Sequence, residues 1–166
     1  MSMIGNFLRM SSRKVEALRA NPERITKVLY PDEEGDTVMS DDVHLDVEKA
    51  WHGIHFLLNG EVWSGTPPLD FIVAGEPIGD VDVGYGPARG FLADQVRAIA
   101  TALEPITPEV LRSRYDAGAP GWAEVYPMHG RADDGALDYL VSYYESLRDF
   151  VIETAELGAG MIVYVN

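Results

Sequence analysis

Residues 45–60 form the most apolar helix-length segment of the chain, and they carry two histidines and a glutamate at helical spacing. Glu48, His52 and His55 stand at i, i+4 and i+7, within about 60° of one another on a helix. Such a group can hold a divalent metal, or it can pair an imidazole base with an orienting carboxylate. The spacing differs from the helical His-Glu-x-x-His zinc signature, and buried histidines are usually hydrogen-bonded within the protein. We therefore favour a structural role and expect no metal and no cofactor.

A second polar group lies in the glycine-rich segment 75–89. Asp80 and Asp82 alternate along the chain, and Tyr85 and Arg89 follow them. In an extended backbone the two carboxylates point the same way, where they could hold a cation or a small polar ligand, or divide acid and base roles. Carboxylates in such turns more often accept from backbone amides, and we favour that interpretation. No Gly-Lys-Ser/Thr follows the glycines, which argues against a phosphate loop.

Six large aromatic residues form a third group, and several of them lie on irregular segments flanked by glycine and proline. They could line a ligand groove, although aromatic side chains in such places more often anchor loops to a core. The six are Trp51, Trp63, Tyr85, Trp122, Tyr126 and Tyr164. Three of them, Trp51, Trp122 and Tyr126, combine with the polar groups above in a candidate ligand pocket of ten residues, with no catalytic residue assigned: Glu48, Trp51, His52, His55, Asp80, Asp82, Tyr85, Arg89, Trp122 and Tyr126.

The elements that must position these residues follow from hydrophobic periodicity and from capping residues. Strands are predicted over 3–10 and 161–165, helices over 13–20, 22–29, 46–59, 66–73, 96–103, 108–115 and 134–157, and irregular loops over 31–44, 75–87 and 118–130. The last strand is almost continuously apolar, which is typical of a strand buried on both faces. Pairing it with the first strand predicts an α+β fold, with a small mixed sheet that joins the chain ends and about six helices packed on it.

Composition limits the class of protein. A chain of 166 residues with 46% hydrophobic content suits one domain over residues 1–166. The absence of cysteine excludes disulfides and thiolate chemistry and fits a reducing compartment. The start lacks the pattern of a signal peptide, and no apolar run reaches the roughly 18 residues of a membrane helix. We expect a cytoplasmic protein.

Charge narrows the choice of partner. The net charge of −14 disfavours nucleic acids and anionic membranes as partners. Residues 1–30 hold six basic and two acidic residues, whereas the remainder holds seven basic and 25 acidic ones. The basic start can dock on the acidic body of the same chain, which we favour, or the acidic face can attract a partner protein with a basic surface.

Three segments together resemble a known family. Residues 45–60, 75–79 and 84–89 are similar to the YfbM-like family of small bacterial proteins, which has no established function, and the similarity extends over nearly the whole chain. Asp46, Trp51, His55 and Gly60 match the family pattern, whereas His52 is not a fixed element of it. The resemblance implies a single α+β domain of bacterial cytoplasmic origin.

Two functional hypotheses follow. The first is an acidic binding protein that contacts a basic protein through the acidic loop over 31–44 and the aromatic loops around Trp63, Tyr85 and Trp122. It rests on the absence of a serine elbow, a cysteine nucleophile, a phosphate loop or a recognised metal motif.

The second hypothesis is a small-ligand protein or hydrolase-type enzyme with its pocket beside the central helix. His55 would act as acid or base, Glu48 would orient it, and Arg89 or Tyr85 would bind an anionic substrate. It requires these side chains to converge on one cleft, and a buried His55 bonded to backbone would contradict it.

Overall fold

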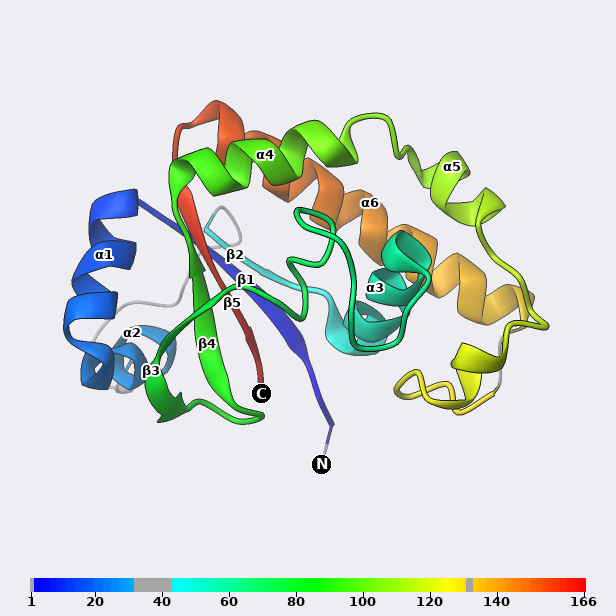
Figure 1. Cartoon of the computed structure of the whole chain (residues 1–166), viewed down its shortest axis with the longest axis horizontal. Coiled ribbons are helices and arrows are strands. Elements are labelled where there is room, and N and C mark those ends of the chain that lie inside the picture. The colour runs from blue at the N-terminus through cyan, green and yellow to red at the C-terminus, as the bar shows by residue number, and fades with distance from the viewer. Residues whose placement is uncertain (1, 32–42, 131–132) are drawn as a thin grey trace.

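A computed structural model describes residues 2–31, 43–130 and 133–166 of the chain (Figure 1). The elements are β1 (Gly5–Met10), α1 (Ser12–Ala20), α2 (Ile25–Leu29), β2 (His44–Asp46), α3 (Trp51–Asn59), β3 (Glu76–Asp82), β4 (Pro87–Phe91), α4 (Ala93–Leu103), α5 (Pro108–Ser113), α6 (Asp134–Glu156) and β5 (Gly160–Val165). The described residues thus form six α-helices and one sheet, which confirms the predicted α+β class. None of the described helices is both long and apolar enough to cross a membrane.

The sheet joins the two ends of the chain. Its five strands lie in the order β2-β1-β5-β4-β3, and each neighbouring pair is antiparallel. β5 is the central strand and pairs with β1 from Gly5 opposite Val165 to Met10 opposite Gly160. The predicted pairing of the first and last strands is therefore confirmed.

Helices cover both faces of this sheet (Figure 1). Met161 and Val163 of β5 pack in the core under α3, α4 and α6, whereas Ile162 and Tyr164 pack in a second core under α1 and α2. All four side chains are buried. Because successive residues of a strand point to opposite faces, a strand covered on both sides must be apolar at nearly every position.

Two arginines of the basic N-terminal part contact the acidic body. Arg9 forms an ion pair of 2.9 Å with Glu153 on α6, and its guanidinium lies over the Phe150 ring. Arg19 pairs with Glu76 at 3.2 Å and donates to the carbonyl of Gly90. At these two positions the basic segment docks on the chain itself, as the favoured interpretation of the charge asymmetry expected.

The start of the central helix differs from the prediction. His44–Asp46 form strand β2, with Leu45 opposite Phe7, and α3 begins only at Trp51. Glu48 has φ of 52°, which a continuous helix does not allow, and its amide donates to the Asp46 carboxylate at 2.8 Å. The Asp46 carboxylate therefore closes a turn between a strand and a helix.

The segment 75–87 was predicted to be irregular, and this prediction is wrong. It forms β3, a turn and the start of β4. β3 is an edge strand, so Pro77 is tolerated there, and the register shifts between Pro77 and Asp82. Gly79 adopts φ of 60° against Pro22, a position that only glycine fills without strain.

The predicted helix over 66–73 is a series of turns instead. Asn59, the last residue of α3, donates to the Leu69 carbonyl at 3.0 Å and accepts from the Thr66 amide at 3.3 Å. These backbone groups are therefore occupied by a side chain and do not form a helical ladder. The expected acidic loop over 31–44 lies mostly outside the described residues.

The close approach of β1 to α3 leaves no room for a side chain at Gly5. A Cβ atom there would lie 2.5 Å from Cβ of Trp51. We expect Gly5→Ala to lower the free energy of unfolding by about 1–3 kcal/mol, because the strand or the helix must shift. Urea denaturation measures this change. Gly135→Ala, at a position with ordinary van der Waals space on α6, is the control and should be neutral or stabilising; equal stability of the Gly5 variant and the native protein would contradict the packing argument.

Candidate functional site

His52 is a buried, neutral link between α3 and two other segments. Its Nε2 lies 2.9 Å from the Val62 carbonyl oxygen, and its Nδ1 accepts from the Tyr126 amide at 3.0 Å. The carbonyl can only accept and the amide can only donate, so the proton sits on Nε2 and the ring is neutral. Burial lowers the pKa of His52, and the hydrogen bond to Val62 opposes this effect only in part.

His55 has the same role one turn further on. Its Nε2 donates to the Ser64 carbonyl oxygen at 3.0 Å, and its Nδ1 faces the Asn59 amide nitrogen at 3.2 Å. The side chain is fully buried, and burial lowers its pKa to about 4. Glu48, which was expected to orient it, is exposed in the turn before α3 and has no hydrogen bond to it. The hypothesis of His55 as a catalytic acid or base oriented by Glu48 is therefore wrong.

The two histidines hold the segment 61–65 against α3, and this places Trp63. The carbonyl groups on either side of Trp63 are the ones that the imidazoles bind. The centroid of the Trp63 ring lies 4.2 Å from the centroid of the His52 ring. The His52 ring in turn stacks on the Trp51 ring, with 4.7 Å between centroids and an interplanar angle of 8°. Trp63 is 59% exposed, although the residues that hold it are buried. The result is a fixed indole with an open face.

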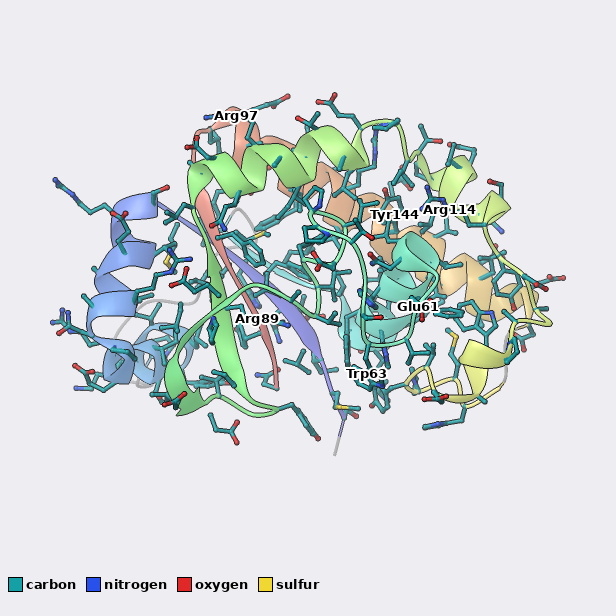
Figure 2. All side chains as sticks on the ribbon, in the orientation of Figure 1. Glu61, Trp63, Arg89, Arg97, Arg114 and Tyr144 are labelled. Atoms are coloured by element: carbon teal, nitrogen blue, oxygen red, sulfur yellow. The ribbon has the colours of Figure 1, made fainter. Side chains whose placement is uncertain are left out.

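Trp63 forms one wall of a pocket between α3 and the sheet. The cavity volume is about 490 Å³, within the range of small-molecule sites. In Figure 2, Arg89 lies on the sheet side of this space and Trp63 on the α3 side. The lining residues are mostly apolar and come from six separate segments: Met3, Trp51, Trp63, Ile72, Val73, Gly75, Pro77, Tyr85, Pro87, Arg89 and Val165.

Arg89 is the one charged side chain among the described residues that line the pocket. Its Nη2 donates to the Ile72 carbonyl oxygen at 2.8 Å, but its Nε is buried and has no partner in the described part of the chain. Burial lowers its pKa to about 10, so the guanidinium remains charged at neutral pH. No described carboxylate forms an ion pair with it, although the chain as a whole is strongly acidic.

Of the ten residues predicted to form a ligand pocket, the structure brings three together around this cavity: Trp51, Tyr85 and Arg89. His52 and His55 do not line the cavity, and they bind the backbone of the segment that carries Trp63. Tyr126 is linked to Trp51 through Met3, whose amide donates to the Tyr126 hydroxyl at 3.1 Å and whose carbonyl accepts from the Trp51 indole.

The remaining predicted residues lie elsewhere. Asp82 accepts from the amides of Gly84 and Gly86, and the Gly84 bond is the main cause of its lowered pKa. This is the turn-capping role that we favoured. Asp80 is part of edge strand β3 and does not line the cavity. Trp122 is only 2% exposed, packs edge-on against Phe56 and lines a second cavity of about 370 Å³.

Sequence reasoning missed most of the apolar pocket wall. Trp63 was noted as an aromatic residue on a turn-rich segment, but Ile72, Val73, Pro77 and Pro87 gave no functional signal. Their contribution arises because β3 is a strand and 66–73 is a turn. In the described part of the chain, no three His, Asp or Glu side chains are arranged to hold a metal ion.

Comparison with known proteins places the chain in a family. Residues 1–164 match the family described as Domain of unknown function (DUF1877). The chain belongs to this family. The crystal structure of YfbM from Escherichia coli, a protein of unknown function, is similar with a TM-score of 0.71 and 19% identity, over 98% of this chain and 99% of that chain. At that identity the similarity shows the fold alone, and no curated protein matches this DUF1877 chain.

The buried histidines predict that this DUF1877 domain loses stability in weak acid. Both pKa values lie below the 6.5 of an unfolded histidine, so the unfolded chain takes up protons first as the pH falls. Stability should be full above pH 6.5 and decline from there towards pH 4, by at most about 1.4 kcal/mol per pH unit for each histidine. Urea denaturation at a series of pH values measures this. The exposed His129 gives the control variant His129→Asn, which should keep the profile; a flat native profile would contradict the neutral assignment.

Removing the His55 nitrogens should release the Trp63 segment. We expect His55→Leu to cost about 1–3 kcal/mol in unfolding free energy, because the Ser64 carbonyl loses its buried donor. His55→Gln should lose less, since its amide nitrogen can reach the same carbonyl. The Trp63 fluorescence should shift to longer wavelength in the leucine variant. Identical stability of the leucine and glutamine variants would mean that the hydrogen bond is unimportant.

Proposed function

We propose that this domain binds a small organic anion in the pocket between α3 and the sheet, with Arg89 as the group that binds the charge. The observation that carries this proposal is a half-buried arginine that lines a mostly apolar cavity, and whose buried Nε has no partner and whose charge has no counter-ion among the described residues. The proposal is one of binding without chemistry. The described lining includes no serine, histidine or carboxylate that could act as nucleophile, acid or base.

The charge of Arg89 is not paired with any described carboxylate. Removing a guanidinium from water costs free energy that only hydrogen bonds and an opposite charge offset. Arg89 has one such bond, to Ile72, and its Nε has none. A carboxylate has two oxygens with the spacing of a guanidinium edge, so it can accept from Nε and from Nη2 together. An anionic ligand therefore supplies the acceptor for Nε and the negative charge that the described residues do not supply to Arg89.

Docking of a basic protein on the acidic surface has less support. That hypothesis used the aromatic loops around Trp63, Tyr85 and Trp122 as one surface, but Trp122 is buried in the core. The acidic residues 32–42 lie outside the described part of the chain.

Isothermal titration of the purified protein with decanoate, 2-naphthoate and the neutral 2-naphthalenemethanol tests the proposal. We expect one-to-one binding of at least one carboxylate and at least about tenfold weaker binding of the neutral alcohol. Arg89→Met should weaken carboxylate binding by a similar factor. Arg97→Met is the matched control, because Arg97 is an exposed arginine on α4 (Figure 2) whose partner is Asp94.

The ligand-free Arg89→Met variant supplies an independent measurement. Replacing an uncompensated buried charge by an apolar side chain is often neutral or stabilising. We therefore expect its melting temperature to equal or exceed that of the native protein, although its carboxylate binding is weaker. Absence of binding by both carboxylates up to about 10 mM, or equal affinity of the Arg89→Met variant, would overturn the proposal.

A further inference from the structure

We propose that the ligand is a planar aromatic monocarboxylate, whose ring lies against Trp63 and Tyr85 while its carboxylate binds Arg89. This inference rests on the proposed function and adds the chemical class of the ligand. It depends on two further features of the pocket. These are the exposed aromatic rings and the presence of a single cation.

Two exposed aromatic rings line the same pocket from different elements. Trp63 follows α3 and is 59% exposed, and Tyr85 lies in the turn between β3 and β4 and is 45% exposed. Large apolar side chains in the described residues are otherwise mostly buried. Aromatic faces prefer to stack on other flat rings, and each such contact contributes beyond the buried area alone. The two prolines of the lining, Pro77 and Pro87, add further flat apolar surface.

The backbone that carries each ring is held in place before any ligand binds. The backbone on either side of Trp63 is bound to His52 and His55, and the indole rests on the His52 ring. The turn that carries Tyr85 is closed by the Asp82 carboxylate, and the Tyr85 amide donates to the Val165 carbonyl at 3.1 Å. A pre-organised site loses little conformational entropy on binding. It also favours a rigid ligand over a flexible alkyl chain, which must be ordered on binding.

The charge of the site limits the ligand to one negative charge. Arg89 is the one cation among the described lining residues, and one of its donors is already bonded to Ile72. A phosphate dianion would bring a second charge and a third oxygen without partners. The net charge of −14 also repels multiply charged anions more strongly than monoanions. A carboxylate satisfies the available donors and leaves no unpaired charge.

The test compares ligands that differ in one property at a time. In titrations with 2-naphthoate, decanoate and 2-naphthyl phosphate, we expect 2-naphthoate to bind at least about tenfold more tightly than either alternative. Trp63→Leu and Tyr85→Leu should each weaken 2-naphthoate binding by about 3–10-fold and change decanoate binding much less. Trp63→Phe should restore most of the affinity, because it keeps a ring. Tyr143→Leu, a tyrosine of α6 outside the pocket, is the control and should bind like the native protein.

The outcomes separate this inference from the proposed function. If decanoate binds as tightly as 2-naphthoate and both need Arg89, the pocket binds anions but the aromatic class is wrong. If 2-naphthyl phosphate binds as tightly as 2-naphthoate, the restriction to one charge is wrong. If no carboxylate binds, or 2-naphthalenemethanol binds as well as 2-naphthoate in the native protein, the proposed function itself fails and this inference fails with it.

Discussion

The antiparallel pairing of β1 with β5 is the constraint on which the rest of the molecule depends. It brings the two ends of the chain to the centre of the sheet, so that β5 is covered on both faces. One face supports α3, α4 and α6, and the other supports α1 and α2 (Figure 1). The same pairing places Val165 and Met3 beside the pocket, and the Val165 carbonyl binds the turn that carries Tyr85. The pocket therefore lies beside one end of the paired strands β1 and β5.

The buried histidines inside this core connect elements of the fold. His52 and His55 lie on an apolar helix, yet each links that helix to backbone groups that have no ladder partner. A neutral imidazole suits this task, because it supplies one donor and one acceptor on opposite sides of a flat ring. The same ring then supports the Trp63 indole. The hydrogen bonds of the buried His52 and His55 thus determine the position of the exposed Trp63 side chain.

Arg89 has fewer polar partners than the other arginines that contact distant parts of the fold. Arg9 and Arg19 reach carboxylates, and Arg114 and Arg148 bond to the carbonyls at the ends of α3 and α4. Arg89 is half-buried with a buried Nε, and among the described residues it reaches one carbonyl and no carboxylate. Natural proteins keep such unfavourable arrangements mostly where binding or catalysis needs them, because elsewhere an apolar residue is at least as stable. This contrast supports the proposal that the pocket binds an anion.

The sequence by itself determined the elements with strong local signals and the class of fold. The apolar stripe of α6, the Thr107-Pro108 start of α5 and the continuous apolar run of β5 depend on neighbours within a few residues. Only the tertiary structure decided that β3 is a strand, because an edge position accepts its proline and glycine. It also decided the role of the histidines, since His52 bonds to an amide 74 residues away. Pocket walls and hydrogen-bond partners are set by contacts between distant segments, and spacing along the chain carries no record of them.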